Sequence, residues 1–255
     1  MNIQNYEYLR DQLFFTGFGN HLEEALKSKI AKGKQEFQLQ FKTQFDADPI
    51  RAELHFSKSK QTDMYFFNSY RLELPQKVDR QASARKFYVN GKDRFTLKEA
   101  YNLLNGRSVH KQVSNYQGEP YRAWFQLDFK TLDMHGNQKM LQYHENYGYD
   151  LEKQLQRFPI VELQNPDSKK NLLDSLGRGN RQLVTFELAT GKERLYLEAL
   201  PRFKAVCIYN EQGIRQEFID NRQQQQHKPN ATLQEQQRQT QVKKQGLIGG
   251  GSSRL

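Results

Sequence analysis

One pattern occurs three times along this chain of 255 residues and limits what the chain can fold into. In each occurrence, a stretch with apolar residues at helical spacing ends at a glycine that has a basic neighbour. The glycines, each with the apolar residue three positions before it, are Gly33 with Ile30, Gly106 with Leu103 and Gly179 with Leu176. A glycine at this place is typical of the left-handed residue that ends a helix, and a cation there suits the negative end of the helix dipole. The pattern therefore predicts three helices that end at these turns.

Segments in which apolar and polar residues alternate follow each predicted helix. The clearest lie at 37–41, 123–129 and 184–188. Strict alternation is typical of antiparallel strands that bury one face and expose the other. We therefore predict an α+β fold of antiparallel sheets, each packed by a helix, with three possible helix-plus-sheet repeats. The middle repeat contains one additional predicted helix at 150–157, which Pro159 would end.

These elements predict three folded units and a tail. The predicted parts are an N-terminal α+β unit at 1–75, a linker at 76–92, a central α+β unit at 93–165, a C-terminal α+β unit at 166–218 and a tail at 219–255. Ten of the 25 residues at 221–245 are Gln. A segment of this composition lacks the apolar area that would offset its ordering entropy, so we expect the tail to be disordered.

The charge of the chain restricts its partners more than its fold. Lys and Arg number 39 and Asp and Glu 29, a formal net charge of +10 that is spread along the chain. Nucleic acid, an anionic membrane surface and an acidic protein are all compatible with it. No apolar run approaches the roughly 18 to 20 residues that span a bilayer, and the first residues lack the pattern of a secretory signal. We therefore expect a cytoplasmic protein without a membrane partner.

Sequence signatures of enzymes and metal sites are absent. There is no Walker A loop, no GxSxG elbow and no HExxH motif, and the single cysteine, Cys207, excludes a multi-thiolate site. His135 and His144 lie nine residues apart across a predicted turn, but their spacing matches no metal-ligand pattern. Asp128, His144 and Glu145 are the residues an enzyme could use. We predict a protein that is not an enzyme and has no cofactor, no metal ion and no identified small-molecule substrate.

Basic residues recur near the three glycine turns. They are Lys32, Lys34, Arg107, Lys111, Arg178 and Arg181. If the three units pack side by side, these cations would form one face that contacts several phosphates of a nucleic acid. The alternative is that each is simply a solvated residue near the end of a helix.

A polar and aromatic cluster at 142–150 is the second candidate site. Tyr143, His144 and Tyr147 are residue types that stack on bases and contact phosphates. A strand end that turns into a helix would use much the same residues, with Gly148 at a positive φ angle and Asp150 as the helix cap. Both interpretations stay open at this point.

Several motifs resemble a known family. They are FTLKEAYNLLNGR at 95–107, AWFQLDF at 123–129, QYHENYGYDLE at 142–152 and GNRQ at 179–182, preceded by a similar segment at 8–70. The chain resembles, over about residues 5–215, a bacterial domain family of unknown function that is encoded on conjugative transposons and related mobile elements. The resemblance implies a cytoplasmic accessory protein of mobile elements, and it brings no catalytic residue or cofactor.

Two function hypotheses follow from these observations. The first is a non-enzymatic accessory protein that binds nucleic acid through a basic and aromatic surface. Its candidate residues are Lys34, Arg107, Lys111, Tyr143, His144, Tyr147, Arg178 and Arg181. The alternative is an adaptor that engages a protein partner through exposed sheet edges or the Gln-rich tail.

Overall fold

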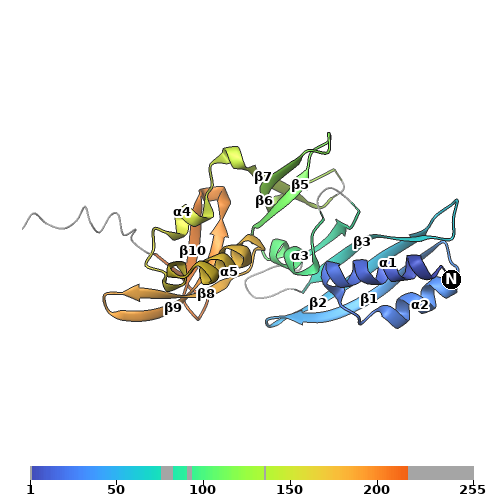
Figure 1. Cartoon of the computed structure of the whole chain (residues 1–255), viewed down its shortest axis with the longest axis horizontal. Helices are drawn as coiled ribbons and strands as arrows, with labels where there is room; N and C mark the ends of the chain where they lie inside the picture. The colour runs from blue at the N-terminus through green and yellow to red at the C-terminus, as the bar shows by residue number, and fades with distance from the viewer. Residues whose placement is uncertain (1, 76–82, 91–93, 135, 218–255) are drawn as a thin grey trace, which may run out of the picture.

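The computed structural model describes residues 2–75, 83–90, 94–134 and 136–217. The tail predicted at 219–255, part of the linker predicted at 76–92 and His135 lie outside the described residues. Figure 1 shows three antiparallel sheets that follow one another along the long axis of the molecule. Among the described helices, none has the length and apolar character needed to cross a membrane.

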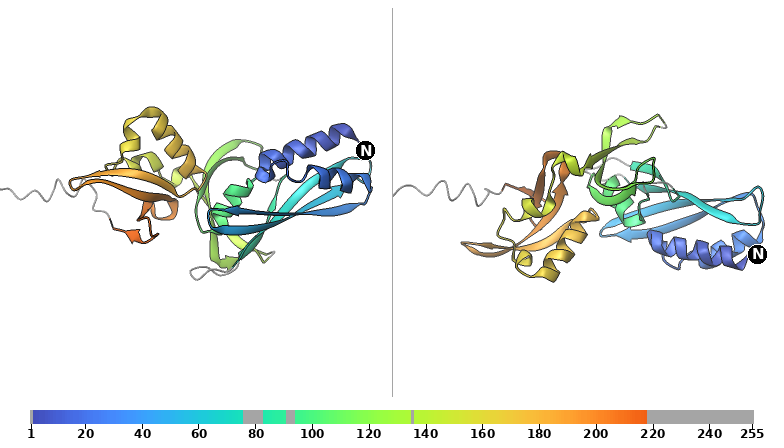
Figure 2. Two further views of the ribbon diagram at one scale, coloured as in Figure 1. Left: turned by 90° about the horizontal axis from the view of Figure 1, so that it is seen from below. Right: turned by 45° about the horizontal axis from the view of Figure 1, so that its top comes forward.

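A four-stranded antiparallel sheet forms the N-terminal part. Its strands pair in the order β1 (Glu36–Phe45), β2 (Asp48–Lys58), β3 (Tyr65–Leu74) and β4 (Ser83–Tyr88). Three helical segments precede it: α1 (Ile3–Leu13), a π-helical turn (Phe14–Phe18) and α2 (Glu23–Ala31). Figure 2 shows α1 and α2 lying along one face of this sheet, which explains why β1 alternates between exposed and buried residues.

Helix α1 is tied to the sheet by one buried side chain. The Asn5 amide donates to the carbonyl of Tyr65 at 2.9 Å, and its oxygen accepts from the Tyr65 N–H at 2.7 Å. The sequence did not predict α1, whose apolar residues at helical spacing include Leu9 and Leu13. Both leucines are buried in the core.

The central part consists of α3 (Leu97–Leu104) and a three-stranded sheet with the order β5 (Val109–Ser114), β6 (Pro120–Leu132) and β7 (Gln138–His144). Thr96 and Glu99 form a reciprocal capping box at the start of α3. Helix α3 packs against β3 and β4 of the first sheet as well as β5 and β6 of its own. A single hydrophobic core therefore extends from Leu9 to Leu127.

The segment that the sequence predicts as a linker contains a strand. Ser83–Tyr88 forms β4, the edge strand that pairs with β3. Phe87 is the anchor: it is 3% exposed and stacks on Tyr70 with ring centroids 5.5 Å apart. Apart from Phe87, β4 carries residues such as Arg85, Lys86 and the exposed Tyr88, which make the composition of 76–92 polar. One buried aromatic residue is too weak a pattern to predict a strand.

A second core lies in the C-terminal part. Its sheet has the order β8 (Gln182–Leu188), β9 (Gly191–Leu200), β10 (Ala205–Tyr209) and β11 (Arg215–Gln216). Its helical segments are a turn at Glu145–Tyr147, α4 (Leu151–Leu155), a turn at Val161–Gln164, α5 (Pro166–Gly177) and a turn at Pro201–Phe203. Trp124 of β6 belongs to this core, whereas its neighbour Phe125 belongs to the first.

The predicted α+β class and the three helix ends are confirmed. Gly33, Gly106 and Gly179 have φ angles of 66°, 79° and 79°. Their N–H groups donate to the carbonyls three residues earlier, of Ile30, Leu103 and Leu176, at 3.0, 2.9 and 2.9 Å. An antiparallel sheet with its strands in sequence order follows each of these turns. The sheets have four, three and four strands, and the boundaries of the three units stay a prediction.

Gly179 is the position where the fold depends most on a missing side chain. A Cβ atom there would lie 2.9 Å from the carbonyl oxygen of Ser108 and 3.1 Å from the Cβ of Asn102. At Gly33, by contrast, a Cβ atom would meet nothing within 4 Å. Both glycines have a positive φ angle, so the two sites differ in the close approach alone.

We predict that Gly179→Ala lowers the free energy of unfolding by about 2–4 kcal/mol, the sum of a left-handed backbone penalty and overpacking. Gly33→Ala is the matched control, with an expected loss of about 1–2 kcal/mol from the backbone penalty alone. Urea denaturation of the two variants measures the difference. Equal losses would show that Gly179 is not in close contact with the end of α3.

Candidate functional site

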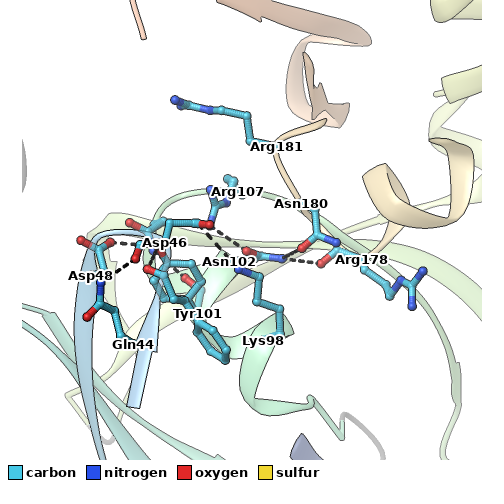
Figure 3. Close-up of polar contacts among 12 residues, drawn as sticks. Gln44, Asp46, Asp48, Lys98, Tyr101, Asn102, Arg107, Arg178, Asn180 and Arg181 are labelled. Carbon is cyan, nitrogen blue, oxygen red and sulfur yellow. Dashed lines mark hydrogen bonds and ion pairs between the residues drawn. The ribbon is translucent and has the colours of Figure 1, made fainter. Parts of the chain in front are cut away.

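The C-terminal part contacts α3 through one buried amide. Asn102 is 0% exposed, and its Nδ2 donates to the carbonyl of Arg178 at 2.7 Å and to Oδ1 of Asn180 at 2.9 Å. Its Oδ1 accepts a hydrogen bond from Nη2 of Arg107 at 2.7 Å. Figure 3 shows this chain of contacts, which joins the turn after α3 to the turn after α5. Asn102 therefore fixes the positions of two basic segments at once.

A polar cleft of about 250 Å³ lies beside this amide. Its lining residues are Asp46, Lys98, Asn102, Arg107, Ser175, Asn180, Arg181 and Gln182. We call it the junction cleft. Three cations come from two different parts of the chain, Lys98 and Arg107 from around α3 and Arg181 from the turn before β8. Asp46 is the one carboxylate among these lining residues.

Aromatic rings hold two of the cations. The guanidinium of Arg107 lies 5.2 Å from the ring centre of Tyr101, and the Nζ of Lys98 lies 4.7 Å from the same ring and 4.5 Å from that of Phe45. Lys98 Nζ is also 3.7 Å from the carboxylate of Asp46. Burial, the largest cause, lowers the pKa of Lys98; the charge of Arg107 lowers it further, and that of Asp46 opposes the shift.

Tyr101 is buried, contacts Lys98 and Arg107 through its ring and keeps its hydroxyl proton. Its hydroxyl donates to Oδ2 of Asp48 at 2.9 Å, and Asp48 is 3% exposed. Burial, followed by this hydrogen bond, raises the pKa of Tyr101 to about 12. The phenol is therefore neutral at physiological pH, and its ring presents an unionised face to Lys98 and Arg107.

Arg181 and Arg178 differ in how they are held. Arg181 Nε is 2.7 Å from a carboxylate oxygen of Glu198, and its guanidinium lies 4.3 Å from the ring centre of Tyr209. Arg178 extends away from the junction cleft, as Figure 3 shows. It lines a neighbouring groove of about 360 Å³ with His110, Lys111 and Arg122 among its other lining residues.

The groove beside the junction cleft is basic as well. Its imidazole, His110, stacks on Trp124 with ring centroids 4.9 Å apart. Burial, followed by the charge of Arg122, lowers the pKa of His110. Since the ordinary pKa of histidine is already below 7, this ring is neutral at physiological pH. The cations of the groove are therefore Lys111, Arg122 and Arg178, and Asp174 is the carboxylate among its lining residues.

Three arginines around the junction lack an acidic partner in the part of the chain that the structure describes. No carboxylate of the described residues lies within 4.0 Å of Arg107, Arg122 or Arg178. The Nε atom of Arg107 is buried and has no hydrogen-bond partner among the described residues. The charges of these arginines are therefore not neutralised by a carboxylate of the described residues.

Lys111 and Lys34 are placed differently from the sequence hypothesis of one shared face. Lys111 Nζ is 2.5 Å from a carboxylate oxygen of Glu99, which neutralises it within the molecule. Lys34 precedes β1, a strand of ten residues whose far end, Phe45, lies beside Tyr101. At about 3.4 Å per residue, Lys34 is about 30 Å from the junction. It lines a separate groove with Lys29, His55 and Lys86.

The cluster at 142–150 is divided between two faces of the sheet. Tyr143 and Tyr147 lie together, with ring centroids 4.9 Å apart. His144 follows Tyr143 in β7, so it points to the opposite face, where it lies 5.0 Å from the ring of Tyr121. The structural interpretation of this segment is confirmed, because Gly148 has a φ angle of 75° and the Asp150 side chain caps α4. The sequence hypothesis of base stacking stays a prediction.

Several basic or polar residues of these surfaces were missed from the sequence. They are Lys98, Asn102 and Arg122, together with Arg202 and Lys204, which contact Tyr147. Two signals were available. Lys98 and Asn102 are four residues apart and so share a face of the predicted helix. Arg202 and Lys204 flank Phe203 in the sequence, an aromatic residue between two cations, and the structure places this segment at a helical turn, Pro201–Phe203.

The described residues contain no group of three or more His, Cys, Asp or Glu side chains that could hold a metal ion. Asp128 is occupied locally, since it accepts hydrogen bonds from the N–H of Lys130 at 3.0 Å and the hydroxyl of Thr131 at 2.8 Å. Cys207 is buried, as its apolar neighbours predict. The chemistry available at the junction is therefore cationic and hydrogen-bonding.

We predict that Asn102→Ala lowers the free energy of unfolding by about 2–4 kcal/mol, because it leaves a buried carbonyl, an amide oxygen and a guanidinium without their partner. Asn68→Ala is a matched control, since the Asn68 amide donates one partly buried bond, to Ser57 at 2.7 Å. Its expected loss is about 0.5–1.5 kcal/mol. Urea denaturation compares the two, and a loss at Asn102 no larger than at Asn68 would contradict the role given to this amide.

Comparisons with family models, curated proteins and solved structures do not relate this site to a known one. No protein-family model matches the chain, and neither the curated proteins nor the solved structures give a match. The resemblance to the mobile-element family therefore stays a prediction from the motifs quoted above.

Proposed function

We propose that this protein binds nucleic acid and that the phosphate backbone lies across the junction between α3 and the turn before β8. The observation that carries the proposal is that the buried Asn102 amide contacts Arg107 and the backbone of Arg178, and that no described carboxylate lies at ion-pair distance from either arginine. Arg122 lines the neighbouring groove together with Arg178. Lys98 and Arg181 extend the same basic area into the junction cleft.

Phosphate chemistry fits this arrangement. A guanidinium presents a planar set of donors that matches two oxygens of one phosphate, and it stays charged at every physiological pH. The fixed guanidinium of Arg107, held by Asn102 and the ring of Tyr101, loses little freedom when a phosphate binds. Each phosphate that is neutralised releases counterions, which supplies the sequence-independent part of the affinity.

The wider biological role in this proposal is a non-enzymatic, cytoplasmic accessory protein in the transfer or maintenance of mobile DNA. The resemblance of the motifs at 95–107 and 179–182 supports it, because these two motifs supply Asn102, Arg107 and Asn180. Two of the four motifs that carry the resemblance thus contribute residues to the junction.

A second candidate function is an adaptor for a protein partner, and one groove favours it. A groove of about 830 Å³ lies between α1 and β5, and β5 is an edge strand of its sheet. Tyr8 and Phe15 line it and are 59% and 77% exposed. An extended peptide would pair with β5 and cover these rings. Its affinity would change little with ionic strength, unlike that of nucleic acid.

The test is fluorescence anisotropy with labelled 20-nucleotide single-stranded and duplex DNA at several salt concentrations. We predict that Arg107→Gln with Arg178→Gln weakens binding about fivefold to tenfold at moderate salt and lowers the salt slope by about 1 to 2. Loss of the charges of Arg107 and Arg178 deprives no carboxylate of the described residues of an ion-pair partner.

The control is Arg10→Gln with Arg71→Gln. It removes the same net charge from exposed positions on α1 and β3, where each arginine is paired with a carboxylate. We expect this variant to bind nearly as tightly as the unaltered protein. An equal loss in the two double variants would show that diffuse charge is responsible, and absence of binding at low salt would remove the proposal.

A further inference from the structure

A short turn between β9 and β10 presents an aromatic ring between two cations. The turn is Pro201–Phe203 followed by Lys204, and Phe203 is 68% exposed at its tip. Pro201 is buried and accepts a hydrogen bond from the N–H of Lys204 at 2.9 Å. Lys204 has φ and ψ angles of 50° and 43°, a left-handed conformation that is uncommon for a residue with a side chain.

This turn is fixed against a second segment far away in the sequence. The hydroxyl of Tyr147 donates to the carbonyl of Arg202 at 2.7 Å. The Nζ of Lys204 lies 4.7 Å from the ring centre of Tyr147, whose other neighbour is the ring of Tyr143. We call Tyr143, Tyr147, Arg202, Phe203 and Lys204 the aromatic shelf. Because these contacts exist within the protein, the shelf is ordered before a ligand arrives.

The charge of the shelf is positive. The guanidinium of Arg202 lies 5.7 Å from the ring centre of Phe203. In the described part of the chain, no carboxylate lies within 4.0 Å of Arg202 or Lys204. Asp128 is the nearby acid: hydrogen bonds from Lys130 and Thr131 are the main causes that lower its pKa, and Arg202 adds to them.

We infer that the aromatic shelf binds single-stranded nucleic acid, with one base stacked on Phe203 and the neighbouring phosphates on Arg202 and Lys204. This inference rests on the proposed function and specifies its substrate as a single strand. Bases of a duplex are stacked on each other, so an exposed ring can reach the face of a base in an unpaired strand. A protein partner would also cover an exposed ring, but two flanking cations with no described carboxylate within 4.0 Å favour a polyanion.

The experiment uses the full chain with three labelled probes: a 20-nucleotide oligothymidine, an abasic strand of the same length and a duplex of the same length. We predict that Phe203→Ala weakens binding of the oligothymidine about five- to tenfold, as the loss of one stacked base requires. Binding of the abasic strand and of the duplex should change less than twofold, because neither offers a free base.

Tyr88→Ala is the matched control, because Tyr88 is 60% exposed on β4 and has Lys86 Nζ 5.4 Å from its ring centre. It resembles the shelf in exposure and in its cation but lies on a different sheet, and we expect it to leave all three affinities unchanged. Since Phe203 and Tyr88 are both exposed, neither substitution removes a core contact.

The outcomes separate the two proposals. A loss confined to the oligothymidine in Phe203→Ala supports the shelf. Unaltered oligothymidine binding in this variant, or an equal loss for all three probes, overturns the shelf while the unaltered protein still binds through the junction. If the unaltered protein binds none of the probes at low salt, the proposed function and the shelf both fail.

Discussion

The arrangement of the molecule depends on the contact between Asn102 and the turn at Gly179. The buried Asn102 amide bridges the turn after α3 and the turn after α5, and Gly179, which has no side chain, lets the two backbones approach closely. Neither the amide nor the glycine alone would hold the two turns together. A side chain at 179 would push the turn away, and without the amide the buried carbonyl of Arg178 would lose its partner. The contact therefore determines where the arginines on both sides of it lie.

The cores on either side of this contact explain why it is stable. Helix α3 packs against the first two sheets, so the N-terminal and central parts share one continuous core. Trp124 on β6 enters the second core and contacts His110 and Tyr149. One sheet thus contributes a residue to each core, Phe125 to the first and Trp124 to the second. The elements that carry the cations of the junction cleft are packed on these two cores, so the cations need little rearrangement on binding.

Patterns among neighbouring residues predicted the helices and strands. They could not predict contacts between residues that lie far apart in the sequence. Alternation and the glycine turns indicated the sheets and the three helix ends because both are properties of neighbouring residues. The same turns suggested a shared basic face, but Lys34 is separated from Arg107 by the whole length of β1. Likewise His144 is adjacent to Tyr143 in sequence and on the opposite face in space. The spacing from Lys98 indicated the helix face of Asn102, but the contacts of Asn102 could not be predicted, because its partners lie 76 and 78 residues away.

The most direct test of binding across the junction is amide hydrogen–deuterium exchange of the full chain with and without a 20-nucleotide oligothymidine. We predict slower exchange in the bound state at 105–111, 178–183 and 201–206, with unchanged exchange at 32–36 around Lys34. Protection of the Lys34 turn together with unchanged exchange at the junction would contradict it, since binding would then depend on a surface about 30 Å away, the length of β1.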